Sequence, residues 1–389
     1  MKEDLLRFTR ELVRIPSPSG EETSVQSFLR YALRQMGYSV KTYAKTPGRP
    51  NLISVLHGFE SKPNLLFIRH ADNISASRAE VWQHPPYSGE LSKGRIYGRG
   101  VADMKSGLAA MIFAGRAIKE SGIRIKGGYS VASVADEEVE SQYGMKYLAR
   151  GFSRGMSPLL VADAAVFGEP SFPWIVVALK GGVWLRITVK GKSIGSGWPH
   201  KGVNAVTRMA KVLLELEKLD LGRLDHPLLG RPTIAAGTTI RGGVGLYSIS
   251  DRCEATVEVY TVPGLGTPEV LSKVERLLEK MKRKDKDLSV KVEPIFEVDS
   301  YLTDSNERVY TCAQSAIMSV MGKHAKRIGV PSVGDARFLR QLGIPCVVAY
   351  GPGEYGREHV IDESVRVESL IRVTKIYALT ALRFWSATG

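Results

Sequence analysis

Four short apolar runs in the sequence each lead into side chains that can bind a metal ion or move a proton. The first three lead into His70, into the acidic pair Glu137 and Glu138, and into Glu169, and the fourth leads into a glycine-rich loop that carries His359. Imidazole and carboxylate groups, with no thiolate among them, suit zinc or a similar divalent ion. These residues therefore predict a metal site.

Asp103 lies in the glycine-rich stretch GRIYGRGVADMKSG, residues 94–107, just before an apolar helical pattern. Gly98 and Gly100 allow tight turns with positive φ and a close approach of the backbone to a ligand. A carboxylate in such a turn can hold a cation between its two oxygens, but aspartate is also an ordinary helix N-cap. Taken alone, this stretch supports both interpretations.

Five candidate ligands exceed what one tetrahedral zinc needs. Two metals that share a bridging carboxylate would use all five and leave room for water. Such a centre suits amide hydrolysis, because it polarises the carbonyl and lowers the pKa of the attacking water. The candidate ligands are His70, Asp103, Glu138, Glu169 and His359.

Each candidate also has an ordinary structural interpretation. His70 could be a hydrogen-bonded histidine at a strand end, the acidic triplet 136–138 a solvated turn, and Glu169 a loop residue. His359 is the weakest candidate by itself, since a single loop histidine is commonly just exposed. The other histidines lack neighbouring acids and strand-end placement and receive no role; they are His57, His84, His226 and His324.

The scaffold for these residues is predicted from apolar runs that alternate with helical patterns. The runs are Asn51–Val55, Leu65–Ile68, Tyr129–Val134, Ala164–Phe167 and Cys346–Tyr350, and the helical patterns include Lys105–Ser121, Asn306–Met321 and Val367–Phe384. This alternation predicts an α/β fold whose sheet has at least some parallel strands. The carboxyl ends of parallel strands line the binding crevice, so the candidate residues should meet at one edge.

The pattern changes between about Gly181 and Val292. Two alternating segments, Val183–Val189 and Arg252–Tyr260, occur there with two helical patterns, Val203–Leu219 and Pro268–Lys282. They predict a smaller α+β domain inserted into the first. We therefore expect a metal-binding catalytic domain formed by residues 1–180 and 293–389, with the inserted domain at 181–292.

Composition places the chain among globular proteins. With 389 residues, 43% of them hydrophobic and 24% charged, it is expected to form two domains. The N-terminus lacks an apolar signal-peptide core and no apolar run reaches spanning length, so we expect no membrane association. Although the net charge is +14, the basic residues are scattered, and nucleic-acid binding is not expected. A reducing cytoplasm fits three widely spaced cysteines, Cys253, Cys312 and Cys346.

Several motifs occur in the order and at the spacings of a known family: HAD at 70–72, YGRGVADMKSG at 97–107, ADEE at 135–138, GEP at 168–170, GDARF at 334–338, and His359. The chain resembles the di-zinc amidohydrolases and exopeptidases that include acetylornithine deacetylase, succinyl-diaminopimelate desuccinylase, aminoacylase and glutamate carboxypeptidase. The similarity covers nearly the whole chain and is weaker in the insert. It implies a zinc exopeptidase-like α/β fold with a mixed, largely parallel sheet flanked by helices. The inserted α+β domain would act as a lid and could join two chains into a homodimer.

The resemblance also implies a role for each ligand. Asp103 would bridge two divalent ions, zinc or alternatively cobalt or manganese. His70 and Glu169 would complete one metal site, and Glu138 and His359 the other.

Further roles follow from the same resemblance. Asp72 would hydrogen-bond to the imidazole of His70 and fix its tautomer. Glu137 would be the general base, taking a proton from the water shared by the metals and passing it to the leaving nitrogen. Arg337 would pair with a carboxylate of the substrate through its planar fork of donors.

The lid departs from the family pattern at three positions. Gly195 stands where a histidine commonly stabilises the oxyanion, Tyr260 where an arginine binds substrate, and Tyr247 where an asparagine begins a turn. Loss of one oxyanion donor typically costs on the order of 10²–10³ in rate. His200, in the following segment, could substitute as a substrate-binding residue.

These observations predict a metal-dependent hydrolase that cleaves the amide bond next to a free carboxylate in an N-acyl amino acid or short peptide, a deacylase or carboxypeptidase of amino-acid metabolism. The alternative is a catalytically weak or inactive metal-bound member that binds amino-acid-like or peptide-like ligands. The presence of Glu137 favours the enzyme, and the altered lid favours the alternative.

Overall fold

The computed structural model describes residues 1–76, 79–150, 159 and 162–386. The chain divides into two compact units: a first unit of residues 1–177, 302–328 and 338–389, and a second unit of residues 178–301 and 329–337. Across these described residues, every helix is too short or too polar to cross a membrane. The predicted fold class, an α/β domain with an inserted α+β domain, is confirmed.

The first unit is built on a six-stranded mixed sheet. In spatial order its strands are β1 (Ser39–Ala44), β2 (Pro50–Leu56), β6 (Tyr129–Val134), β3 (Leu65–His70), β7 (Ala164–Phe167) and β16 (Cys346–Val347). β6, β3, β7 and β16 are parallel, whereas β1 and β2 are antiparallel additions at one side. Every residue of β3 and β6 is buried, which is why these strands are continuous apolar runs in the sequence.

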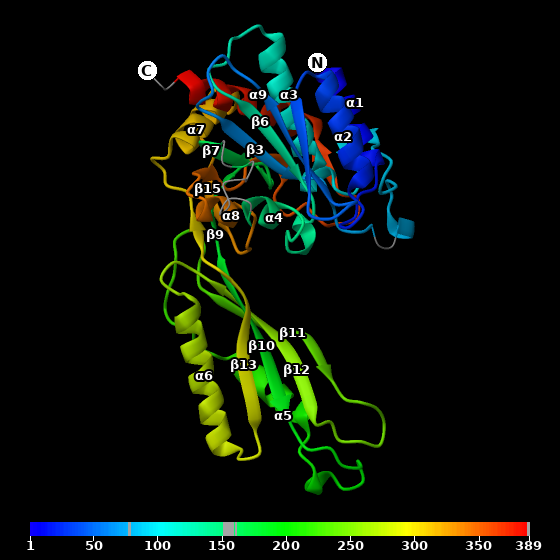
Figure 1. Cartoon of the computed structure of the whole chain (residues 1–389), viewed down its shortest axis with the longest axis vertical. Coiled ribbons are helices and arrows are strands. Elements are labelled where there is room, and N and C mark those ends of the chain that lie inside the picture. Colours follow the sequence, from blue (N-terminus) through cyan, green and yellow to red (C-terminus); the bar gives the residue numbers. More distant parts are fainter. Residues whose placement is uncertain (77–78, 151–158, 160–161, 387–389) are drawn as a thin grey trace. The chain divides into compact units, whose positions relative to one another are not determined.

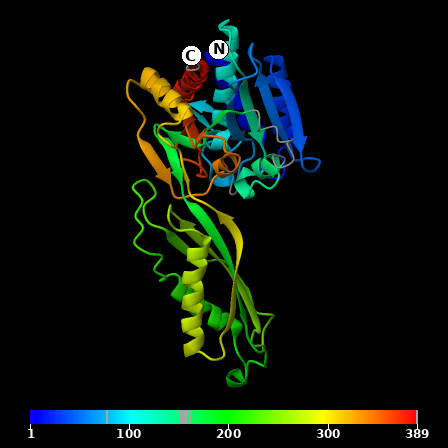
Figure 2. The same ribbon diagram turned by 60° about the vertical axis from the view of Figure 1, so that its left-hand side comes forward.

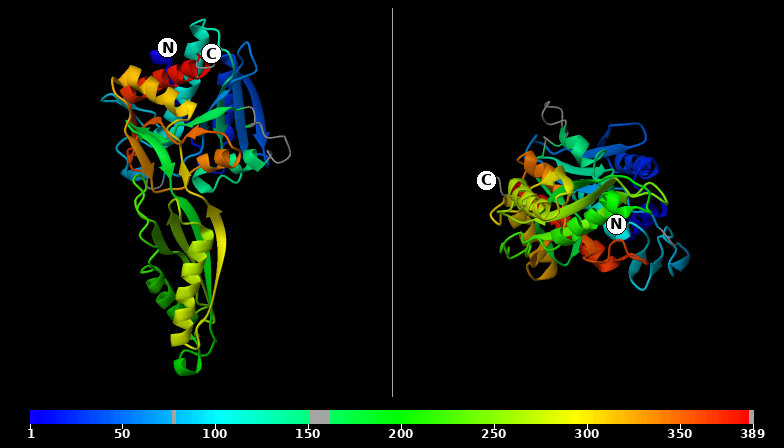
Figure 3. Two further views of the ribbon diagram at one scale, coloured as in Figure 1. Left: turned by 90° about the vertical axis from the view of Figure 1, so that its left-hand side faces the viewer. Right: turned by 90° about the horizontal axis from the view of Figure 1, so that it is seen from below.

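Helices cover this sheet and bind its strands into one core. Those that pack against it or against one another are α1 (Lys2–Arg14), α2 (Thr23–Gln35), α3 (Ser106–Glu120), α7 (Arg308–Met321) and α9 (Val367–Ser386). Two shorter helices of the chain are α4 (Met145–Arg150) and α8 (Ala336–Gln341). α3 packs against β3 and α9, and α9 also packs against α7 (Figure 1, Figure 3). α3 is almost wholly buried, and Asp103 lies in the turn directly before it.

Smaller sheets shape the loops around the carboxyl ends of the parallel strands. One pairs β8 (Pro170–Phe172) with β17 (Gly351–Glu354), a second has the order β18 (Ser364–Arg366), β5 (Arg95–Tyr97), β4 (Leu91–Ser92), and a third has the order β14 (Tyr301–Leu302), β9 (Ile175–Leu179), β15 (Arg327–Val330). The predicted strand Cys346–Tyr350 is shorter than expected. It ends at Val347, after which Ala349 pairs with Val176 and the chain enters β17.

The second unit is a four-stranded antiparallel sheet with two helices on one face. The strand order is β11 (Thr233–Gly242), β12 (Arg252–Thr261), β10 (Gly181–Lys190), β13 (Ser289–Val298), and α5 (Ala205–Leu216) and α6 (Thr267–Lys284) pack on it (Figure 2). Sequence periodicity predicted only the two central strands, because they alternate between buried and exposed side chains. β11 and β13 lie at the edges and are largely exposed, and in β13 the alternation is interrupted by Pro294.

Candidate metal centre

A glycine turn positions Asp103. Gly98 has φ 144°, and a Cβ there would come within 2.4 Å of the Val13 side chain, while Gly100 is left-handed with φ 78°. The chain then makes one wide turn over Val101–Lys105 before α3 begins. Asp103 has φ −119° and ψ 88° within that turn, and the N-cap of α3 is Lys105. Asp103 is therefore not the helix cap, and its carboxylate is available for another purpose.

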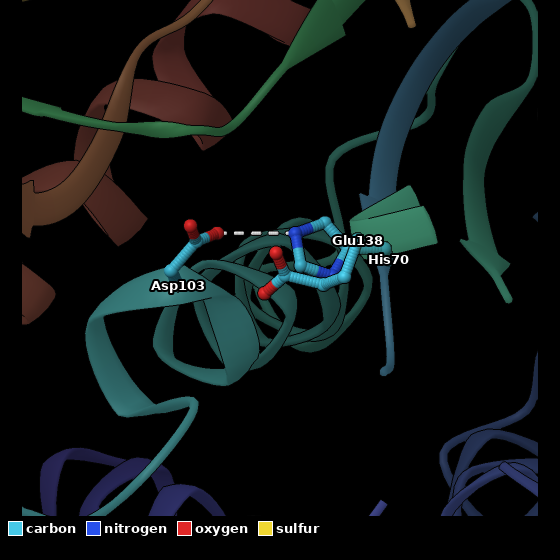
Figure 4. A group of neighbouring side chains, drawn as sticks. All are labelled: His70, Asp103 and Glu138. Carbon is cyan, nitrogen blue, oxygen red and sulfur yellow. Dashed lines mark hydrogen bonds and ion pairs between the residues drawn. The ribbon is translucent and has the colours of Figure 1, made fainter. Parts of the chain in front are cut away.

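The two carboxylate oxygens of Asp103 face two different histidines. Oδ1 lies 3.0 Å from Nε2 of His70, and Oδ2 lies 3.4 Å from Nε2 of His359. His70 reaches Asp103 from the end of β3 (Figure 4). One carboxylate thus stands between two imidazoles that come from opposite ends of the sequence.

The tautomer of His70 follows from its second ring nitrogen. Nδ1 lies 2.9 Å from the backbone carbonyl oxygen of Asp72 and 3.5 Å from its carboxylate. A carbonyl oxygen can only accept, so Nδ1 carries the hydrogen and donates it. In the neutral ring Nε2 then has its lone pair free, as a metal ligand requires.

The Asp72 carboxylate connects His70 to the acidic turn that follows β6. It accepts hydrogen bonds from the Ser19 hydroxyl at 2.7 Å and from the backbone N–H groups of Glu137 at 3.2 Å and Glu138 at 3.3 Å. Burial opposes its ionisation, but the interaction with His70 and these donors outweigh burial and lower the Asp72 pKa. One buried carboxylate therefore orients both the imidazole and the turn.

The acidic turn is not a solvated loop. Asp136 has φ 68° and is buried in an ion pair with Arg49 at 2.6 Å, and Arg49 also binds Glu22. The next residues form the short 3-10 turn η3 (Glu137–Val139), from which the Glu138 carboxylate reaches to 3.1 Å from Nε2 of His359. Sequence reasoning missed Arg49 and Glu22, because nothing local in the sequence links them to this turn.

Glu169 and His359 lie at the same place. Glu169 follows β7, and its Oε2 is 3.9 Å from Nε2 of His70. His359 stands in the loop between β17 and β18 with φ 62°. Ligand atoms of His70, Asp103 and Glu138 all lie within 4.8 Å of one another. The first unit thus brings all five predicted ligands together, with Glu137 on the same turn as Glu138.

Arg69, directly before His70, is a further residue that sequence reasoning missed. Its side chain is fully buried. Its guanidinium fills the space where a Cβ on Gly107 or on Gly168 would lie, each only 2.1 Å away. Burial lowers the Arg69 pKa, and the charges of Tyr377, Glu169 and Asp103 act in the opposite direction. Two glycines of the sequence motifs therefore make room for a buried cation beside the carboxylates.

Other predicted residues belong to the second unit. His200 is exposed in the short helix η6 (Pro199–Lys201), and the Arg337 guanidinium lies 5.3 Å from the ring centroid of Phe296. The Tyr260 hydroxyl donates to Glu258 at 3.2 Å, and Tyr247 is strongly exposed. Substrate-binding roles for His200 and Arg337 stay predictions. Asp163, an acid close to Glu169 in sequence, binds Lys62 and the backbone of Asn64 instead.

The residues fit a divalent metal centre by the chemistry of their donors. Among the described residues of the cluster the donors are two imidazole nitrogens and carboxylate oxygens, as in catalytic zinc sites. Without an ion, contacts between the two histidines and the carboxylates hold the cluster together. Burial works against charging His70, but hydrogen bonds to Asp103 and Asp72 and the charge of Glu169 raise its pKa well above the usual value. The pKa of Asp103 is lowered, because the two histidines outweigh its burial.

We expect the metal-free protein to lose one stabilising contribution as pH rises. Hydrogen bonds to Asp103 and Glu138 raise the pKa of His359 from 6.5 to about 10. A group whose pKa is higher in the folded state than in the unfolded state stabilises the fold fully at pH values below its unfolded pKa. This stabilisation is lost as the pH rises to its folded pKa. Chelator-treated wild type should therefore exceed His359→Gln in Tm at about pH 6, and the two should converge by about pH 10. A Tm difference that grows with pH would contradict this assignment.

Comparison with known proteins identifies the family. The model of peptidase family M20/M25/M40 matches residues 66–383. The chain is 30% identical over 400 residues to succinyl-diaminopimelate desuccinylase of Methylorubrum populi, covering 98% of each protein. It is 26% identical over 403 residues to N-formyl-4-amino-5-aminomethyl-2-methylpyrimidine deformylase of Bacillus subtilis, covering 96% of this chain and 93% of that one.

A solved structure supports the fold. The M20 family metallo-carboxypeptidase of Sulfolobus solfataricus superposes with a TM-score of 0.79 at 18% identity, covering 98% of this chain and 99% of that one. The resemblance to the di-zinc exopeptidase and amidohydrolase family is thereby confirmed. The chain belongs to peptidase family M20/M25/M40 and is a metal-dependent hydrolase of amide bonds.

Proposed function

We propose that this protein hydrolyses the amide bond next to a free carboxylate in an N-acyl amino acid or a short peptide, using two divalent ions, zinc in the first instance. The observation that carries the proposal is the placement of Asp103, whose two oxygens face His70 and His359 separately. Glu169 stands on the His70 side and Glu138 on the His359 side. This is the arrangement that a carboxylate shared by two ions needs.

The ligand roles follow from that arrangement. Asp103 would bridge the ions, with His70 and Glu169 completing one site and Glu138 and His359 the other. When bound, the ions polarise the scissile carbonyl and lower the pKa of water. His70 donates the hydrogen on Nδ1 to the Asp72 carbonyl, which leaves Nε2 facing Asp103, where it would be free to hold an ion.

Glu137 would be the general base. Its backbone N–H donates to the Asp72 carboxylate, and it directly precedes the proposed ligand Glu138. The backbone position of Glu137 is therefore fixed relative to the metal ligands. A carboxylate there can take a proton from the attacking water and deliver it to the leaving nitrogen. Arg337 would bind the substrate carboxylate through two parallel N–H groups, and His200 would be a further polar contact.

We further propose that the second unit, the counterpart of the insert predicted at 181–292, acts as a lid and joins two chains into a homodimer. Its edge strand β11 is largely exposed, as a surface that pairs with another chain would be. Light scattering of the purified chain tests this, and a monomer at all concentrations would exclude it.

The second candidate is a weak or inactive member that binds amino-acid-like or peptide-like ligands. Gly195 favours it, because glycine has no side chain to act as an oxyanion donor.

A substrate assay separates the two candidates. Zinc, cobalt or manganese would be added to protein whose metal has been removed with a chelator. Each preparation would then be tested on N-acetyl and N-succinyl amino acids, an N-formyl compound and dipeptides. We expect metal-dependent release of amine from at least one substrate with a free carboxylate, and a much slower reaction with its methyl ester. Metal binding without turnover of any substrate would support the binding protein instead.

A further inference from the structure

A buried carboxylate, Glu363, lies beneath the turn that carries Asp103. Its side chain is fully buried. Oε1 accepts hydrogen bonds from the backbone N–H groups of Ala102 at 2.8 Å and Asp103 at 3.1 Å, and Oε2 accepts from Gly100 at 3.2 Å. The guanidinium of Arg99 donates to Oε2 at 2.7 Å. Both oxygens of one side chain therefore hold the backbone of the Asp103 turn.

The backbone around Glu363 ties the same turn to the His359 loop. The Gly98 N–H donates to the carbonyl oxygen of Glu363 at 2.9 Å. Directly after Glu363, β18 pairs with β5, the strand that leads into the glycine turn. His359 is only four residues before Glu363 in the sequence. Glu363 thus stands where the segment carrying Asp103 meets the segment carrying His359.

Burying a carboxylate is costly unless its oxygens are hydrogen-bonded and its charge is paired. Glu363 meets both conditions through three backbone donors and Arg99, which also stacks over the Trp82 ring at 5.0 Å. The positive φ of Gly100 turns successive N–H groups toward one point, which makes an anion-binding concavity. The anion in that concavity is a side chain of the protein itself.

We propose that Glu363 is the positioning residue that sets Asp103 between His70 and His359, and so determines how tightly the metal ions are held. The inference rests on the proposed function, in which Asp103 and His359 are ligands. Glutamine at this position would keep the shape but replace one acceptor oxygen by an NH₂ donor facing N–H groups. The backbone of the turn would then shift, and the two oxygens of Asp103 would no longer face His70 and His359.

The test is the zinc dissociation constant of metal-free protein, measured by competition with a zinc-sensitive dye. Glu363→Gln should weaken zinc binding by roughly 10–100-fold, the usual cost of losing a residue that orients a ligand. Glu354→Gln is the matched control. Glu354 pairs with Arg95 of β5 and with Arg366 of β18. These two arginines lie opposite each other at the start of β5, whereas the glycine turn follows the other end of β5. The zinc affinity of the Glu354→Gln protein should stay within about twofold of that of the wild type.

The outcomes are distinct. Zinc binding by Glu363→Gln equal to wild type, even with a lower Tm, would show that Glu363 only stabilises the fold and would overturn the inference. If Glu363→Gln does not fold, Glu363→Asp, which keeps the charge but is one methylene shorter, is judged by the same criterion. A wild-type chain that binds no zinc would overturn the proposed function and this inference with it.

Discussion

Replacing Glu137 with glutamine is expected to lower kcat by roughly 10²–10⁴ while zinc stoichiometry stays that of wild type. Glutamine has the same shape, so the hydrogen bond from its backbone N–H to Asp72 remains. An amide cannot take a proton from water, so the step assigned to Glu137 is lost. Because the substrate is bound by other groups, KM should change much less than kcat.

The control for this variant is Glu140→Gln. Glu140 follows the same turn and is exposed, and its carboxylate accepts a long contact of 3.5 Å from Gln142. Its kcat should remain near that of wild type. Equal rates for wild type and Glu137→Gln on a substrate that wild type cleaves would remove Glu137 from the mechanism.

Replacing Asp103 with asparagine should abolish tight zinc binding and, with it, activity. The variant removes the charge and one acceptor oxygen between His70 and His359, so neither ion keeps its shared ligand. The loss of affinity should exceed the roughly 10–100-fold typical of a residue that only orients a ligand. In the metal-free variant the pKa of His359 should also be lower than in metal-free wild type, because the hydrogen bond to Asp103 is the largest cause of its raised value.

Asp163→Asn serves as the comparison, since Asp163 binds Lys62 and the Asn64 backbone rather than the cluster. Its zinc affinity should match wild type. Isothermal titration of both variants with zinc, and histidine titration by NMR for the metal-free proteins, give the two quantities. Wild-type affinity in Asp103→Asn would refute the bridging role.

Much of the site could be predicted because its residues obey a local rule. His70 ends the buried parallel strand β3, Glu138 and Glu169 follow β6 and β7, and the ends of these three strands meet at one edge. Asp103 was different. Its stretch alone supported a helix cap equally well. It became a candidate ligand only beside the other four residues, and the resemblance to a family gave it the bridging role.

Apart from Asp72, which the resemblance assigned to His70, the residues that hold the ligands could not be predicted, because their partners are distant in sequence. Arg49 reaches Asp136 across 87 positions, and Glu363 reaches Asp103 across 260. A buried charged residue looks the same in sequence as an exposed one until the fold places its partner. The edge strands of the second unit, β11 and β13, were also missed, and both are largely exposed.

The most direct test of the central claim is anomalous diffraction at the zinc absorption edge from crystals of the zinc-loaded chain. Two peaks are predicted, one on each side of Asp103, with a carboxylate oxygen within roughly 2.0–2.2 Å of each. One peak should also touch His70 and Glu169, and the other Glu138 and His359. A single peak that leaves Asp103 on one ion only, or no peak at this cluster, would contradict the account.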